Sequence, residues 1–392
     1  SYGEQGNDNL LRYDSLEGGY VPDYYPWQGL YPLEYPNANQ VGGLIGALEN
    51  KKLSWEKSGN LNVGIEASMF DGRLNVSAEY YNRKTTDMLL GYPKATSSGF
   101  SEYNANIGSM RNTGFEFSLG GSLIKTTDFI WNLTWMGSTV TNKVLKLTGE
   151  SPEIIKGVFS IKEGMPINTY YMAKSAGVDP ATGAQLYWVY DKDDNGNITN
   201  EYISSDYQKA ANSKYYSGSR IPDLYGSINT DFSYKNFDFS MVMQGVAGNQ
   251  IVNRKRGDRR WHSELNYDLD QFENRWTGEG STNEYMSAKG SVKPWNISNF
   301  NSFYVEDGSY FRIQNVQVAY TFPKKDFGKF KMPSIRLSLT ADRPLTVFKA
   351  NSFSPELGSK NEKGEIASSS YGFDERVYPL ASSYTLGLRI IY

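Results

Sequence analysis

The chain has 392 residues, with 40 Lys+Arg against 43 Asp+Glu, a formal net charge of −3, no cysteine and one histidine, His262. These counts exclude disulfides, thiol nucleophiles, thiolate metal sites and multi-histidine metal centres. The slight negative charge argues against a nucleic-acid-binding protein, which is normally basic.

Alternation of apolar and polar residues dominates the chain, whereas no run approaches the roughly 18 apolar residues that a membrane-spanning helix needs. In one such segment, Leu61, Val63 and Ile65 are separated by Asn62 and Gly64. A period of two predicts β-strands with one apolar face. The segments with this period are 61–70, 73–82, 111–122, 129–140, 225–234, 237–246, 309–321, 334–342 and 384–392. We expect these nine strands and one more before residue 50.

The phase of the alternation changes once inside a predicted strand. Phe311 and Ile313 lie on one phase, whereas Val316 and Val318 lie on the other. One extra residue in a strand produces such a change. The sequence therefore predicts a β-bulge near Gln314–Asn315.

The connections between the predicted strands alternate between short and long. Short turns are expected at Asp71–Gly72, 125–128, Lys235–Asn236 and 323–328. The long connections are 83–110, 141–224, 247–308 and 343–382. Successive connections of an antiparallel sheet lie at opposite ends, so one end carries only turns. Short periplasmic turns and long extracellular loops are typical of outer-membrane β-barrels, as is a chain with 15% aromatic residues, 30 of them tyrosine.

Several dispersed motifs resemble those of one family, the SusC/RagA-type TonB-dependent outer-membrane transporters. They occur in the order of that family and cover about residues 50–392. The motif segments are Leu53–Lys57, Asn62–Glu66, Tyr80–Leu90, Ser98–Phe100, Asn106–Asn112, Gly114–Glu116, Val178–Gly183, Pro222–Gly226, Tyr234–Asp238, Asp307–Arg312 and Tyr384–Leu388. Two features depart from the family: Asp342–Thr346 replaces an "NLFT"-like stretch, and the chain ends in Tyr392 rather than phenylalanine.

The resemblance implies the fold and the domain organisation. It implies an all-β, antiparallel transmembrane barrel of about 22 strands around a plugged lumen, of which residues 1–392 form the C-terminal part. The plug domain, the TonB box and the N-terminal extension are expected upstream of this chain.

The resemblance also implies an importer in the bacterial outer membrane rather than an enzyme. The expected partners are a SusD-like lipoprotein lid, TonB acting through the plug, outer-membrane lipid and lipopolysaccharide, but no nucleic acid. The expected ligand is an oligosaccharide, with a peptide as the alternative. Two rival functions remain open: a barrel that anchors or adheres without transport, and an outer-membrane enzyme with its site in the loops.

One loop resembles the start of a calcium-binding loop. Asp191, Asp193 and Asn195 alternate before Gly196, as oxygen ligands of Ca²⁺ do in such loops. The carboxylate expected at the twelfth position is displaced by one residue. The sequence therefore leaves two interpretations, a Ca²⁺ site in residues 191–202 and a polar turn; no other cofactor is expected.

Aromatic residues in the long connections are candidates for contact with a ligand or partner. Aromatic rings offer a large contact area and stack on sugars or on peptide side chains. The candidates are Trp27, Tyr187, Trp188, Trp261, Trp276 and Trp295. The alternative is that these rings pack the loops or anchor the barrel in the membrane. A basic run at 254–260 could meet lipopolysaccharide phosphates or remain solvated.

Overall fold

The fold was analysed in a computed structural model of the chain. The structure describes residues 2–7, 11–14, 19–22, 27–29, 35–37, 40–42, 45–100, 102–147, 152–253, 269–281, 284–287, 301–327, 330–350, 354–355 and 380–391. Two compact units divide the chain. Unit 1 comprises 1–64, 79–115 and 140–168, and unit 2 comprises 65–78, 116–139 and 169–392.

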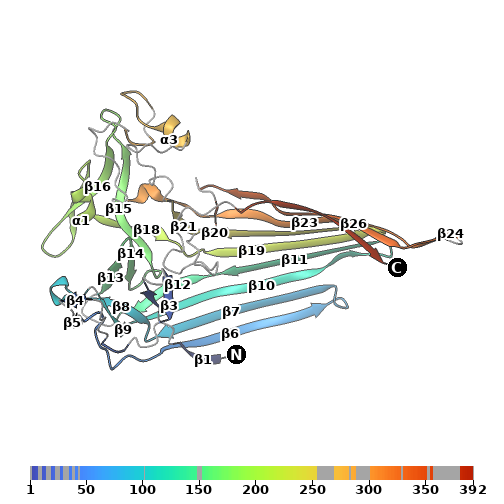
Figure 1. Ribbon diagram of the computed structural model, residues 1–392, viewed down its shortest axis with the longest axis horizontal. Coiled ribbons are helices and arrows are strands. Elements are labelled where there is room, and N and C mark those ends of the chain that lie inside the picture. Colours follow the sequence, from blue (N-terminus) through green and yellow to red (C-terminus); the bar gives the residue numbers. More distant parts are fainter. Residues whose placement is uncertain are drawn as a thin grey trace. The chain divides into compact units, whose positions relative to one another are not determined.

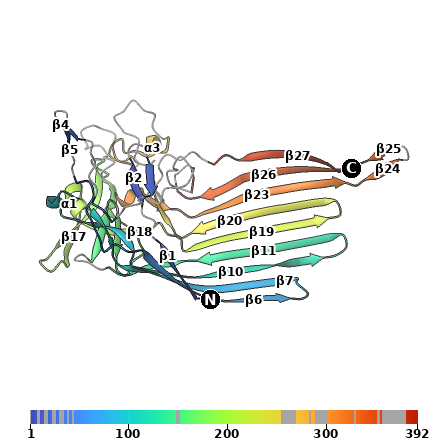
Figure 2. The ribbon, with the colours of Figure 1, turned by 60° about the horizontal axis from the view of Figure 1, so that its bottom comes forward.

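The main sheet follows the order of the chain, β1-β6-β7-β10-β11-β19-β20-β23-β26-β27, and β12 (Thr141–Lys146) also pairs with β10. In unit 2, neighbouring strands from β11 to β27 run side by side in alternating directions (Figure 1, Figure 2). The strands are β1 (Tyr2–Asn7), β6 (Glu56–Met69), β7 (Leu74–Thr86), β10 (Ser109–Lys125), β11 (Phe129–Thr139), β19 (Leu224–Tyr234), β20 (Phe237–Ala247), β23 (Tyr310–Phe322), β26 (Ser334–Phe348) and β27 (Ser383–Ile391).

The long connections contain shorter elements. Unit 1 holds β2 (Leu11–Asp14), β3 (Gly19–Pro22), β4 (Tyr35–Asn37), β5 (Gln40–Gly42), β8 (Leu89–Pro93), η1 (Thr96–Ser98), β9 (Glu102–Asn106), β13 (Glu153–Lys156) and β14 (Phe159–Lys162). Unit 2 holds β15 (Thr169–Val178), β16 (Gln185–Lys192), β17 (Ile198–Ser204), α1 (Tyr207–Asn212), β18 (Lys214–Ser219), β21 (Gln250–Val252), α3 (Leu269–Asn274), η2 (Ser302–Tyr304), β22 (Val305–Asp307), β24 (Lys325–Phe327) and β25 (Phe330–Met332). None of the helices in these described ranges is long and apolar enough to cross a membrane.

The predicted strands are confirmed, and β1 supplies the strand expected before residue 50. The first predicted turn is also confirmed. The Arg73 N–H donates to the Phe70 carbonyl at 3.1 Å, and Asp71 and Gly72 have φ angles of 54° and 79°. Positive φ at both central residues is what a type I′ hairpin turn requires.

The predicted bulge is present, and it explains why β26 is longer than expected. Met243 pairs with Ile313 and Val242 with Asn315, so Gln314 is the extra residue. On the other side, Ile313 pairs with Leu345 and Asn315 with Asp342. The bulge lets β26 pass through Arg343–Pro344 and continue to Phe348, although proline normally interrupts a central strand.

The apolar face of the sheet is exposed rather than packed on a core. Leu386 and Leu388 on β27 are 78% and 63% exposed. The alternate residues carry the polar contacts: Asn132 Nδ2 donates to Asp231 Oδ2 at 2.9 Å. A sheet with one bare apolar face and one hydrogen-bonded polar face fits a barrel wall between lipid and lumen.

We expect Leu386→Arg, near the middle of β27, to destabilise the protein in bilayers by about 2–4 kcal/mol, because it places a cation against lipid hydrocarbon. The measurement is reversible unfolding of the protein in lipid vesicles. Thr385→Arg, on the opposite face of the same strand, is the control and should cost much less. Equal losses for both variants would contradict the assignment of the two faces.

Candidate functional site

The two longest connections of unit 2 fold against each other into a loop platform, which we define as β15–β18, α1, α3, β21, β22 and η2. β15 pairs with both β16 and β18 (Figure 1), and β16 pairs with β17. The Tyr170 hydroxyl donates to the Gln250 carbonyl at 3.2 Å, and the Ser175 N–H donates to Ser302 Oγ at 3.0 Å. These bonds join residues that are far apart in the chain, so the two connections form one body.

A glycine turn and a tryptophan also join the two connections. The Asp179 carboxylate accepts hydrogen bonds from Thr182 Oγ1 at 2.6 Å and from the Ala181 N–H at 2.9 Å. These bonds lower the pKa of Asp179, and the bond from Thr182 has the largest effect. A Cβ on Gly183 would lie 2.4 Å from Cε3 of Trp276. The turn therefore needs glycine where the indole ring packs.

Trp276, one of the predicted contact residues, lies in the core of the platform. It is 7% exposed, and its Nε1 donates to the Pro180 carbonyl at 2.8 Å. Its ring packs in a cluster with Val178 and Tyr285. The structure thus gives Trp276 a packing role, and its contact with a ligand or partner stays a prediction.

The predicted neighbours Tyr187 and Trp188 lie on opposite faces of β16. Tyr187 is 6% exposed and packs with Val189, Ala173 and Ala210 beneath α1. Burial raises the pKa of its phenol. Trp188 is half-buried on the other face, where it pairs with Lys174 of β15. Trp188 is therefore the one of the two whose face is open to a ligand.

The Asp-rich segment forms the tip of the β16–β17 hairpin. Asp193 Oδ1 accepts hydrogen bonds from the backbone N–H groups of Asn197 at 2.8 Å and Asn195 at 3.0 Å. These bonds lower the pKa of Asp193, and the bond from Asn197 has the largest effect. Asp191 Oδ2 accepts a long bond of 3.4 Å from Asn200. Within the described ranges, no group of three His, Cys, Asp or Glu residues converges on one point. The carboxylates thus support the turn geometry, and calcium binding stays a prediction.

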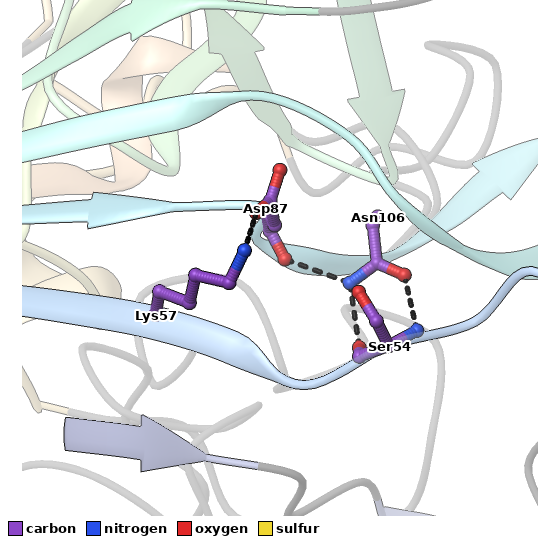
Figure 3. Close-up of polar contacts among 4 residues, drawn as sticks. All are labelled: Ser54, Lys57, Asp87 and Asn106. Carbon is purple, nitrogen blue, oxygen red and sulfur yellow. Dashed lines mark hydrogen bonds and ion pairs between the residues drawn. The ribbon is translucent and has the colours of Figure 1, made fainter.

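In unit 1, three motif segments meet at a polar junction built around Asn106 (Figure 3). Its Nδ2 donates to the Ser54 carbonyl at 2.7 Å and to the Asp87 carbonyl at 2.9 Å. Its Oδ1 accepts the Ser54 N–H at 2.8 Å. Asp87 also pairs with Lys57, whose Nζ lies 3.3 Å from Oδ2. Asn106 therefore ties together the entry to β6, the end of β7 and the end of β9.

The main chain around this junction is held just as closely. The Ile107 N–H donates to the Met88 carbonyl at 2.8 Å, and the Met88 N–H donates to the Gly108 carbonyl at 3.2 Å. Gly108 has a φ of 94°, and a Cβ there would lie 2.6 Å from the Lys146 carbonyl oxygen. The motif residues thus share a structural role in fixing the base of the 87–108 connection.

The remaining predicted contact residues are not gathered into one site. Trp27 belongs to unit 1 and is 45% exposed, and its carbonyl accepts the Asn50 N–H at 3.0 Å. Trp261, Trp295 and the basic run 254–260 lie outside the described residues. Neither Lys174 nor the bridging role of the motif residue Asn106 is predicted from the sequence, because their partners lie on segments whose register the sequence does not reveal.

We expect Asn106→Ala to destabilise the 87–108 connection by about 1–3 kcal/mol, because it leaves a backbone N–H and two carbonyls without their partner. Thermal unfolding and limited proteolysis of this connection measure the loss. Lys57→Met is the control; it removes only an exposed ion pair, worth about 0–1 kcal/mol. A larger effect for Lys57→Met than for Asn106→Ala would contradict the central role of Asn106.

The 191–202 hairpin should loosen in acid. The folded-state pKa of Asp193 lies below its usual 3.8, so its contribution is complete above that value and is lost as pH falls through the folded-state pKa. Hydrogen exchange of this segment, corrected for intrinsic rates, should accelerate below about pH 4 in the wild type but not in Asp193→Asn. An identical acid response in both proteins would contradict this role, and protection on adding Ca²⁺ would support the metal interpretation.

Comparisons with known proteins agree with this architecture. Residues 7–342 match the family described as "TonB dependent receptor-like, beta-barrel". The chain is 29% identical to TonB-dependent receptor P26 of Formosa agariphila over 410 residues, which cover 100% of this chain and 39% of the relative. It is 26% identical to TonB-dependent receptor SusC of Bacteroides thetaiotaomicron over 87% of this chain and 32% of that protein.

Among solved structures, the RagAB peptide transporter superposes with a TM-score of 0.78 at 25% identity, covering 100% of this chain and 40% of the matched chain. A second structure, the RagAB peptide importer in its "closed-closed" state, gives a TM-score of 0.75 at 25% identity, with the same coverage. The chain spans between about one third and two fifths of the length of these relatives. It belongs to the TonB-dependent receptor family of outer-membrane β-barrels, and within that family it is of the SusC/RagA type.

Proposed function

We propose that this chain forms part of the wall and the outer loops of an active importer for oligosaccharides, with peptides as the alternative ligand class. The observation that carries the proposal is the asymmetry of the sheet. One end has short turns, as at Phe70–Arg73, whereas the described parts of the 169–223 and 248–309 connections form the loop platform of unit 2. The family consists of transporters rather than enzymes, which agrees with this role.

The proposed mechanism gives this chain a passive part. The strands hold a path through the membrane in which every backbone group is hydrogen-bonded within the protein. A plug encoded elsewhere in the full protein fills that path, and TonB pulls on the plug with energy from the inner-membrane proton gradient. This chain therefore needs no hydrolytic chemistry, and its task is to position the loops at which the ligand is captured.

A SusD-like lipoprotein is the proposed lid over the loop end. Two relatives support this partner: SusC, which is similar over 87% of this chain, and the RagAB transporter, whose name denotes a two-component assembly. The platform suits a docking role because its two connections are joined by Trp276 and by the Ser175–Ser302 hydrogen bond. A rigid surface loses little conformational freedom when a lid closes on it.

We expect the protein, extracted from outer membranes in a mild detergent, to co-purify with a surface lipoprotein in stoichiometric amount. Mass spectrometry of the purified complex identifies the partner. Cells without TonB should keep this complex and its surface binding of ligand but lose uptake of radiolabelled oligosaccharide or peptide. If the protein purifies alone, and if cells that lack it take up oligosaccharide and peptide normally, these results would instead support a non-transporting anchor.

A further inference from the structure

One face of the loop platform carries an exposed cation between two aromatic rings. Lys174 Nζ lies 5.3 Å from the centroid of the Trp188 ring and 5.1 Å from that of Tyr215. Lys174 pairs with Trp188 across β15 and β16. Tyr215 lies on β18, on the other side of β15. Three strands therefore place one ammonium and two ring faces together.

The charge of Lys174 has no counter-ion among the residues that the structure describes. Glu201 on β17 lies against Tyr215, since its Oε1 accepts a 2.6 Å hydrogen bond from the Tyr215 hydroxyl, but it forms no ion pair with Lys174. Lys192, further along β16, lies 5.1 Å from the ring of Tyr190. The site therefore offers an external anion a cation that forms no ion pair within the described part of the chain.

Trp188 adds a second donor beside this cation. Across the described ranges, its indole N–H has no hydrogen-bond acceptor, and the ring is half-buried rather than enclosed. The adjacent Ile203, which pairs with Trp188 from β17, is 48% exposed. An ammonium, an indole N–H and apolar surface thus meet at an accessible place.

The support behind this face is rigid. Tyr187, Val189 and Ala210 form a buried cluster on the opposite face of the same strands. The Ser175 N–H, next to Lys174, donates to Ser302 Oγ at 3.0 Å and fixes β15 to the second connection. A site held in this way is arranged before the ligand arrives, which favours binding.

We propose that Lys174, Trp188 and Tyr215 form a binding site for a carboxylated sugar residue within an oligosaccharide, a deeper specification that rests on the proposed function. The ammonium and the indole N–H would donate to the carboxylate through charge-assisted bonds. The ring faces would cover the C–H surface of the pyranose. A neutral sugar would use only the rings, and a peptide made of acidic residues alone would use only the cation, so a uronic acid matches both parts.

The test is calorimetric titration of the intact protein, isolated from outer membranes with its co-purifying chains, with trigalacturonate, maltotriose and triglutamate. Lys174→Met should weaken trigalacturonate binding by about 10–100-fold, the range that loss of a charge-assisted hydrogen bond produces. Trp188→Phe should weaken it less, since the ring remains. Lys192→Met removes the same charge from the same strand and should leave the affinity within about twofold.

Several results would overturn the proposal. Equal losses for Lys174→Met and Lys192→Met would indicate a general electrostatic effect rather than a site. Triglutamate that binds as tightly as trigalacturonate, with the same dependence on Lys174, would assign the site to acidic peptides. Trigalacturonate binding that Lys174→Met leaves unchanged, or binding of maltotriose without any binding of trigalacturonate, would refute this site but leave the importer intact. Equal ligand uptake by cells with and without the protein would refute the proposed function itself.

Discussion

Hydrogen bonding of the backbone in a medium without water is the constraint on which the rest of the structure depends. A membrane-spanning strand cannot leave N–H and C=O groups facing lipid, so each strand must be paired along its length. In the ladder, each strand from β7 to β26 has a paired neighbour on both sides, and tight turns join the strands at one end. Even the turn residues contribute: the Lys235 N–H donates to the Asp128 carbonyl, and the Thr321 N–H donates to the Asn236 carbonyl.

The bulge in β23 shows how the wall tolerates an interruption. Arg343, with a φ of 50°, and Pro344 have no direct partners in β23. Side chains take over at this point. Asp342 accepts hydrogen bonds from Asn315 Nδ2 at 2.7 Å and from Ser383 Oγ at 2.9 Å, and Arg343 Nε donates to the Ala381 carbonyl at 3.0 Å. The neighbouring strands are thus joined by polar side chains where the backbone ladder breaks.

The sequence predicts the strands, the bulge and the turns because these depend on local alternation and on residues such as Gly72. It does not predict the sites, because these depend on pairing between distant segments. Trp276 is buried because Gly183, far away in the chain, leaves room for its ring. Lys174 acquires two aromatic neighbours only through the registers of β15 with β16 and β18. The local pattern determines which face of a strand a residue lies on, whereas the strand registers determine which residues it contacts.

Import requires that the loop platform faces the outside of the cell and that the short turns face the periplasm. The chain contains no cysteine, so single cysteines can report this orientation directly. The measurement is labelling of intact cells with a membrane-impermeant maleimide after Asp194→Cys in the β16–β17 hairpin or Thr127→Cys in the β10–β11 turn. We expect Asp194→Cys to be labelled in intact cells and Thr127→Cys to be labelled only after lysis. Labelling of Thr127→Cys but not of Asp194→Cys in intact cells would contradict this orientation.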